Sequence, residues 1–436
     1  MRTHRPTDGI RRARTANESP TQIEIAARNR ECNGCLATIG SHLSETSGEE
    51  NMKLGAPASK VALAHVEMCT MVGRPPSTSK KLKSKYSISY SRFNRMPKLH
   101  GTMPVDYIGL VAAMVRTAAA GKVVSVTSTT ATSFLADSVL QYLSSTAHGV
   151  SISQDFHELK DFVGTAYTGV LGAGLCYMWM LHDGYVWKAH YEEIVIAHGS
   201  GKAVPEPDFV FAKTGDIAIV ESKGTGRKLV SAVTAAKNGY LHQVEPGARR
   251  ALHGGIFASR GYAFGTALNT TIGAGSSCIE MACIFRNYSP PPKALAGCKP
   301  SVPVAPNPHQ PLSAGLQLVR KANYAELYRQ LGLDSKQIAS VVQSLHQGDQ
   351  TLFQSPHRFR LMIDGEAWTA WLALPFGIIR GIERGQYPEA LAEAQRARGP
   401  TVVGGQDPSL IFVNFPDHSR VLFRKEETRD PHISAE

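Results

Sequence analysis

Apolar and polar positions follow regular patterns most clearly between residues 151 and 288. Long apolar stretches predict helices, whereas short runs rich in Val, Ile, Tyr and Phe between glycine or proline breaks predict strands. The predicted elements are a helix at 156–181, strands at 185–196, 208–212 and 216–222, a helix at about 229–251, and strands at 261–268 and 278–285. This succession of helices and strands predicts an α/β fold.

The flanking segments have weaker patterns and divide the chain. Few apolar positions repeat in the first hundred residues, and the prolines from Pro290 to Pro311 exclude regular structure. We predict five regions: a partly disordered N-terminal region (1–100), a lead-in with a helix near 107–120, a strand near 123–126 and a helix near 133–143 (101–150), the α/β domain (151–288), a Pro-rich linker (289–312), and a C-terminal accessory domain with helices at 316–331 and 335–345 and a strand from Leu410 (313–436). In the last region, Trp368 and Trp371 have a helical or core spacing, and we expect them to pack in a core.

One segment raises the alternative of a membrane span. Phe162 to Leu181 is a run of twenty residues without a formal charge, which is long enough to cross a bilayer. The run is only moderately hydrophobic, because it contains threonines, tyrosines and four glycines. A strand-like alternation follows from Tyr185 to Tyr191. We therefore expect a helix buried against a sheet, and no association with a membrane.

The charge balance favours a polyanionic partner. The chain has 436 residues, with 47 Lys and Arg against 36 Asp and Glu, and a net charge of +11. Such an excess favours nucleic acid, although part of it lies in an arginine cluster at Arg2–Arg14 and a lysine cluster at Lys80–Lys85. Solvated tails are the alternative interpretation of both clusters.

The cysteines indicate a reduced compartment. Seven cysteines are irregularly spread, and the first twenty residues contain no apolar segment typical of a secretion signal. We therefore predict a cytoplasmic protein without a disulfide framework. Cys32, Cys35, His65 and Cys69 offer four potential ligands for Zn²⁺, but a single CxxC pair is not specific, and a structural zinc is not expected.

The candidate chemistry lies on two neighbouring predicted strands. Pro207-Asp208 precedes the strand at 208–212, and Glu221-Ser222-Lys223 ends the next one, before a turn at Gly224-Thr-Gly. Residues i and i+2 of a strand point to the same face, so Glu221 and Lys223 project together. Two carboxylates and a lysine at one sheet edge suit a hard cation with a water beside it. The alternative is that Glu221 and Lys223 form a neutral surface pair.

These residues resemble the PD-(D/E)xK nuclease superfamily, whose pattern is a strand-borne Asp, a short gap, and Glu-x-Lys on the next strand. The resemblance covers about residues 155–285 and includes the order helix, three strands, helix, strand. It implies a restriction-endonuclease-like core, which is a mixed sheet flanked by helices, and hydrolysis of phosphodiester bonds. It also implies that Asp208, Glu221 and the carbonyl of Ser222 ligate Mg²⁺, for which Mn²⁺ can substitute, and that Lys223 orients the attacking water or stabilises charge on the phosphate.

Two further positions follow from the same resemblance. Many members carry an acidic residue on the helix before the first strand, and Glu158 is the candidate, although it lies at the helix start and Thr165 occupies the middle. Glu192 and Glu193 are alternatives on the next strand. Gln243, on the helix after the motif, is a candidate to face the site, with a solvent-facing glutamine as the alternative.

We therefore expect a Mg²⁺-dependent nuclease acting on nucleic acid, with DNA as the favoured substrate. The resemblance implies a role in bacterial defence or mobile-element biology, and the flanking regions suggest a homodimer or a regulatory protein partner. The alternative is a catalytically inactive nuclease-like module that binds nucleic acid or serves as a scaffold. A membrane-attached interaction protein anchored by Phe162 to Leu181 is a third hypothesis.

Overall fold

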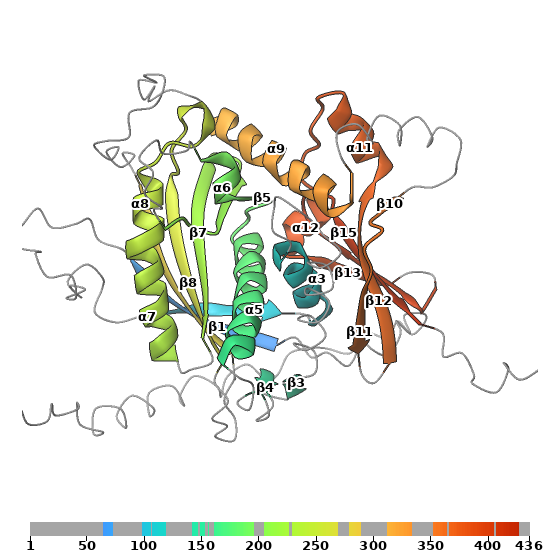
Figure 1. Cartoon of the computed structure of the whole chain (residues 1–436), viewed down its shortest axis with the longest axis horizontal. Helices are drawn as coiled ribbons and strands as arrows, with labels where there is room; N and C mark the ends of the chain where they lie inside the picture. The colour runs from blue at the N-terminus through green and yellow to red at the C-terminus, as the bar shows by residue number, and fades with distance from the viewer. Residues whose placement is uncertain are drawn as a thin grey trace, which may run out of the picture. The chain divides into compact units, whose positions relative to one another are not determined.

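The computed structural model describes two β-sheets with helices packed against them (Figure 1). The described residues are 64–72, 98–105, 107–118, 142–146, 149–152, 156, 161–195, 205–225, 229–268, 279–288, 312–333, 352–363, 366–404 and 407–426. Most of the predicted N-terminal region lies outside these ranges, as does the predicted Pro-rich linker (289–312) except for Leu312. The same is true of the strand predicted near 123–126, most of the helix predicted near 133–143, and the helix predicted at 335–345.

The first sheet has seven strands in the order β2-β1-β9-β8-β7-β6-β5. The strands are β1 (Ala64–Val72), β2 (Lys98–Val105), β5 (Trp187–His190), β6 (Phe209–Lys213), β7 (Asp216–Thr225), β8 (Arg260–Leu268) and β9 (Ile279–Asn287). Strands β5, β6 and β7 are antiparallel neighbours, and β8 runs parallel to β7. Since β1 also pairs in parallel with β9, the sheet is mixed, as the resemblance implies.

Helices cover both faces of this sheet. The helices of this part are α3 (Tyr107–Ala118), α5 (Asp161–His182), α6 (Tyr191–Ile194), α7 (Leu229–Gly239), a π-helix (Tyr240–Val244), α8 (Glu245–Ala248) and a 3₁₀ turn (His253–Gly255). Gly172 of α5 lies against Ser222, whereas Gly239 of α7 lies against Glu221. Because successive residues of β7 point to opposite faces, α5 and α7 pack on opposite sides of the sheet.

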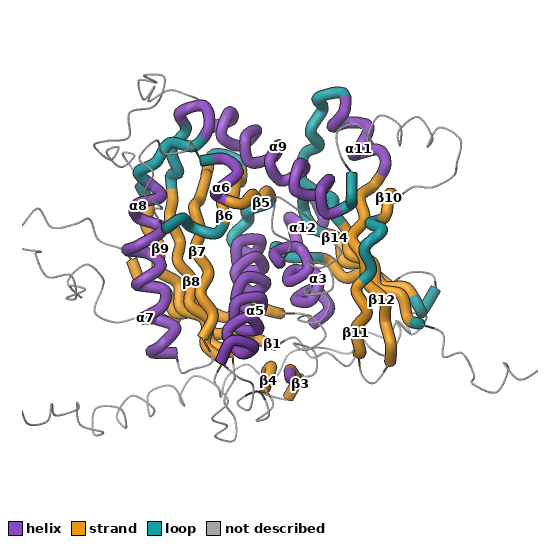
Figure 2. Tube along the Cα trace, viewed as in Figure 1, coloured by secondary structure: helices purple, strands orange, loops and turns teal. Residues whose placement is uncertain are grey.

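The second sheet is antiparallel and has six strands, in the order β10-β12-β15-β14-β13 with β11 beside β12 (Figure 2). Its elements are β10 (Leu352–Gln354), β11 (Phe359–Ile363), β12 (Glu366–Pro375), α11 (Phe376–Glu383), α12 (Ala392–Ala397), β13 (Thr401–Gly404), β14 (Leu410–Asn414) and β15 (Arg420–Lys425). A separate pair, β3 (Leu143–Thr146) and β4 (Gly149–Ile152), forms a small hairpin.

Helix α9 (Leu312–Gln330) belongs in sequence to the predicted accessory region, yet it packs against β5 and β6 of the first sheet. Strand β5 is an edge strand, and its Lys188 N–H donates to the side-chain oxygen of Asn323 on α9 at 3.3 Å. The helix therefore covers the open edge of the sheet, where an unpaired backbone group would otherwise be costly.

Several predicted elements are confirmed, and others need correction. The strand predicted at 185–196 ends at His190, because the following residues form the short helix α6. The helix predicted at 229–251 is divided into α7, a π-helical turn after Gly239, and the short α8, which ends at Ala248. The tryptophan pair of β12 does pack in cores, but on a strand and not on a helix, so the two rings lie on opposite faces of the second sheet.

The uncharged run that raised the membrane alternative is part of α5. Its side chains Tyr167, Leu171 and Cys176 are fully buried in the core cluster beside the first sheet. Among the described helices, none combines the length and the apolar character needed to cross a membrane.

Candidate active site

Asp208 and Glu221 lie side by side on neighbouring antiparallel strands. Phe209 of β6 pairs with Val220 of β7, so the next position brings the two acids opposite each other. The Asp208 N–H donates to Glu221 Oε2 at 3.1 Å, and the Ser222 N–H donates to Asp208 Oδ2 at 2.9 Å. Each carboxylate is thus held by the backbone of the other strand, and this reciprocal arrangement fixes their positions.

Lys223 lies on the same face of β7 as Glu221 and forms an ion pair with it through Glu221 Oε1. Glu221 is fully buried, whereas the Lys223 side chain is 40% exposed and Asp208 is half-buried. Gly239 of α7 closes the site, since a Cβ atom there would lie 2.9 Å from Glu221 Cγ. The three polar groups therefore meet at one place, and solvent reaches them past Lys223 and Asp208.

The electrostatics of the acid pair are unfavourable without a cation. Burial, followed by the neighbouring charge of Asp208, raises the pKa of Glu221 to about 8, although Lys223 opposes this shift. Burial also raises the pKa of Asp208, against the hydrogen bond from Ser222 and the charge of Lys223. Glu221 Oε1 is buried, and Lys223 is the cation that pairs with it among the described residues. Two desolvated carboxylates in contact favour either a proton or a bound cation.

Ser222 helps to hold Asp208 in place. Its N–H holds Asp208, and its side chain points to the opposite face, where a Cβ atom at Gly172 of α5 would lie 3.5 Å from Ser222 Oγ. That hydroxyl oxygen is buried and has no hydrogen-bond partner among the described residues. Metal ligation by the Ser222 carbonyl stays a prediction of the resemblance.

Gln243 holds the segment that leads into Asp208. Its Nε2 donates to the backbone carbonyl of Glu206 at 2.8 Å, from the π-helical turn after α7. The Glu206 carboxylate forms an ion pair with the buried Arg250 at 2.6 Å, and the Tyr191 N–H donates to the Asp208 carbonyl at 3.2 Å. The sequence does not predict this support, because Arg250 and Tyr191 belong to no recognisable motif.

The additional acid expected for the site is not found among the described side chains. Glu158 lies outside the described residues. Glu193 forms an ion pair with Arg329 of α9, and Glu192 is exposed on α6. Thr165 is exposed on α5. Asp208 and Glu221 are therefore the two acids that the structure brings together.

The donor set of the site fits a magnesium ion. In the described part of the chain, no group of three or more His, Cys, Asp or Glu side chains is arranged to hold a metal. Mg²⁺, however, needs only one or two carboxylates, because it keeps several waters. Asp208 and Glu221 meet that requirement, and the pKa values of both carboxyl groups stay raised although Lys223 pairs with Glu221, which favours a further cation beside them. Cys32 and Cys35 lie outside the described residues, as do the side chains of His65 and Cys69.

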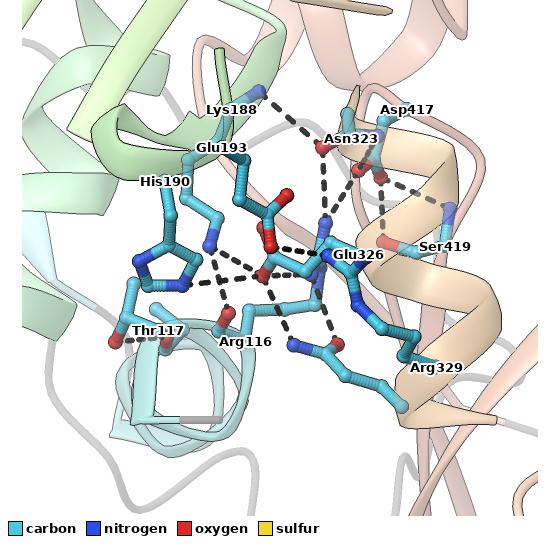
Figure 3. A network of polar contacts seen from close by, with 12 residues as sticks. Arg116, Thr117, Lys188, His190, Glu193, Asn323, Glu326, Arg329, Asp417 and Ser419 are labelled. Atoms are coloured by element: carbon cyan, nitrogen blue, oxygen red, sulfur yellow. Dashed lines mark hydrogen bonds and ion pairs between the residues drawn. The ribbon is translucent and has the colours of Figure 1, made fainter. Parts of the chain in front are cut away.

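A second polar cluster joins the two sheets and is named here the buried network: Arg116, Lys188, Asn323, Glu326 and Asp417 (Figure 3). All five side chains are fully buried. Lys188 Nζ lies 2.6 Å from Glu326 Oε1, and Arg116 donates to Asp417 Oδ2 at 2.9 Å. Residues of α3, β5, α9 and the β14–β15 turn are thereby tied together.

The buried network balances its charges. It contains two cations and two anions, and Asn323 donates to Asp417 Oδ2 at 3.0 Å. Burial alone would raise the pKa of Glu326, but Lys188 and Arg116 more than offset it and hold the pKa below its ordinary value. In the same way, Arg116 and neighbouring hydrogen bonds lower the pKa of Asp417 against its burial. These carboxylates need no further partner, which is typical of a structural role.

The chain was also compared with known proteins. No family model, no curated protein and no solved structure matches it. A proposal for the function therefore depends on the geometry of Asp208, Glu221 and Lys223.

Proposed function

We propose that the chain is a metal-dependent nuclease with a restriction-endonuclease-like core. The observation that carries the proposal is the convergence of Asp208, Glu221 and Lys223 on adjoining strands. Both carboxyl groups are desolvated, and each accepts a hydrogen bond from a backbone N–H of the other strand. Carboxylates whose pKa values are raised by burial and by each other are frequent at functional sites.

The order of elements around the site supports the same proposal. Helix α5 precedes the antiparallel strands β5, β6 and β7, and α7 then leads to β8, which runs parallel to β7. This is the helix, three strands, helix, strand succession that the resemblance implies. The acidic residues lie at the start of β6 and towards the end of β7, where the superfamily pattern expects them.

In this proposal, Asp208 and Glu221 hold Mg²⁺, with Mn²⁺ as a substitute. A bound divalent ion polarises a phosphate and lowers the pKa of its water. Lys223 is paired with Glu221 and partly exposed, so its ammonium group is placed to donate to an attacking water or to a phosphate oxygen. Gln243 and Arg250 keep the Glu206–Asp208 segment in position through its backbone and side chain.

Nucleic acid is the substrate class that the net charge of +11 favours, and DNA remains the preferred choice. A homodimer, a regulatory partner and a role in bacterial defence or mobile-element biology remain predictions of the resemblance.

The test is cleavage of plasmid and linear DNA with Mg²⁺ by the full chain, beside D208N, E221Q and K223A. We expect each variant to lose activity by about 10²-fold or more, because each removes a group that stabilises charge in the transition state. The matched control is E366Q/K425A, which removes a similar half-exposed ion pair (2.5 Å) from β12 and β15. Equal cleavage by wild type and the three site variants would refute the proposal.

An inactive nucleic-acid-binding module is the second candidate. The observation that favours it is the complete burial of Glu221 beneath Gly239, with its remaining oxygen already paired to Lys223. It predicts binding of DNA that weakens steeply with salt and no Mg²⁺-dependent cleavage.

A further inference from the structure

One face of the second sheet carries arginines in a regular arrangement. The strand register forms three rows across the sheet. The first row contains Arg360, Thr369, Arg424 and Leu410. The second, apolar row contains Trp371, Leu422, Phe412 and Val403, and the third contains Gln354, Ala373, Arg420, Asn414 and Thr401. This surface is named the arginine face. An apolar row thus lies between two rows that each contain arginine.

The arginine face is distinct from the core. The residues that alternate with these along β12 and β15, such as Trp368, Val421 and Phe423, point to the opposite side of the sheet and belong to the main hydrophobic cluster. The apolar row forms a small cluster of its own around Trp371 and Leu422. Trp371 and Leu422 are buried in this cluster, whereas Phe412 is partly exposed and Val403 is 42% exposed.

Arg358 extends the basic character into the apolar row. Its guanidinium carbon lies 4.3 Å from the centre of the Trp371 ring, and it donates to the Ser355 carbonyl at 2.8 Å. Trp371 is only 7% exposed beneath it. The indole therefore orients the guanidinium, a geometry that arginine adopts readily because its planar cation stacks on aromatic rings.

The charges of the arginine face are only partly compensated. Arg360 forms an ion pair with Glu426 at 2.9 Å. Hydrogen bonds from Ser409 lower the pKa of Asp407, and the positive charge of the nearby Arg424 lowers it further to a smaller extent. Within the described residues, neither Arg358, Arg420 nor Arg424 forms an ion pair. Four arginines therefore face two carboxylates.

We propose that the arginine face binds a single-stranded segment of nucleic acid, with phosphates on the arginines and base or sugar surfaces against Phe412 and Val403, the members of the apolar row that solvent reaches. Guanidinium groups match phosphate oxygens with paired donors. Arg420 and Arg424 are four residues apart on one strand, roughly 13 Å at the rise of an extended chain. A duplex presents mainly phosphates and leaves the apolar row unused, so it fits less well. The proposal rests on the proposed function only in naming nucleic acid as the partner.

The test is fluorescence anisotropy of a labelled single-stranded DNA oligonucleotide with the full chain carrying E221Q, in EDTA, so that cleavage does not interfere. We expect R420A/R424A in that background to bind about 10-fold more weakly. The slope of log affinity against log salt should fall by about 1.4, because each lost phosphate contact on a single strand contributes about 0.7. R420K/R424K should retain most of the slope, since it keeps both charges.

The matched control is R384A/R396A, which removes the arginine that follows α11 and an arginine of α12, both outside the arginine face, and should leave affinity and slope unchanged. An unchanged slope in R420A/R424A would overturn the inference, as would equal competition by polyglutamate of the same charge or tighter binding of the duplex. If the wild-type chain bound the oligonucleotide through the arginine face but did not cleave DNA with Mg²⁺, only the proposed function would be refuted.

Discussion

The chain contains two buried clusters of mixed charge that differ in balance. In the buried network, each carboxylate lies next to a cation, and the pKa values of Glu326 and Asp417 are lowered. In the candidate active site, two carboxylates contact each other beside one partly exposed lysine, and both carboxyl pKa values are raised. Burial is common to both clusters, so the arrangement of neighbouring charges accounts for the difference.

This contrast separates structural polar groups from functional ones. Buried ion pairs with complete partners hold segments together, and removing one member leaves an uncompensated charge. A buried pair of like charges is unfavourable by itself and persists only where a proton or a cation compensates for it. The same residue type, glutamate, thus has opposite energetic roles at positions 326 and 221.

The largest expected effect comes from the same substitution at the two glutamates. E326Q leaves the buried Lys188 without the counter-charge that lies 2.6 Å from its Nζ, and should lower the free energy of unfolding by roughly 3–5 kcal/mol. E221Q relieves repulsion from Asp208 and should be neutral or stabilising without a divalent ion. Urea denaturation in EDTA measures both values.

The control for this comparison is K188M/E326Q, which removes one cation together with its anion. It should recover much of the stability lost in E326Q, because Arg116 and Asp417 remain paired at 2.9 Å. Equal losses in E326Q and E221Q would mean that the two clusters do not differ as described.

The next effect is the pH dependence of stability. Because folding raises the pKa of Glu221 from 4.5 to about 8, the folded state binds the proton more tightly, and its contribution to stability is lost as pH rises through that window. Relative to wild type, E221Q should gain roughly 1–3 kcal/mol between pH 4.5 and pH 8 in EDTA. Denaturation curves across this range measure it, and parallel curves for the two proteins would contradict the raised pKa.

The smallest effect is expected at Gly239, the glycine above the acid pair. A Cβ atom there lies 2.9 Å from Glu221 Cγ, so G239A should displace the carboxylate and lower Mg²⁺-dependent activity, with a loss of only about 1 kcal/mol in stability. G169A is the control, because Gly169 of α5 is helical and has nothing within 4 Å of an added Cβ atom. It should be neutral or slightly stabilising. Activity assays and thermal denaturation measure both variants. Equal activity and equal stability of G239A and G169A would contradict this prediction.

The sequence predicts the candidate site because its members are close in the chain. Asp208 and Glu221 are separated by thirteen residues and lie on two strands joined by a short turn, so local patterns suffice to place them opposite each other. The alternation of β7 also predicts that Glu221 and Lys223 share a face. Burial of Glu221 is not predicted, because it depends on Gly239 and on how α7 packs.

The buried network could not be predicted in this way. Arg116 meets Glu326 and Asp417 across 210 and 301 residues, and no local pattern records such contacts. Lys188 alternates along a strand as a solvent-facing lysine does, and its burial follows only from the packing of α9 over β5. The same limit applies to β1, which adds to the first sheet from a region whose apolar pattern is weak.

The most direct test is titration of Mn²⁺ into the metal-free full chain by calorimetry in two buffers of different ionisation enthalpy. Burial makes Asp208 and Glu221 hold their protons more tightly than carboxyl groups in water do. Binding of a cation should therefore release protons near pH 7. We expect D208N and E221Q to lose this binding and E366Q/K425A to keep it. Unaltered Mn²⁺ binding and proton release in D208N and E221Q would show that these two carboxylates do not form the metal site.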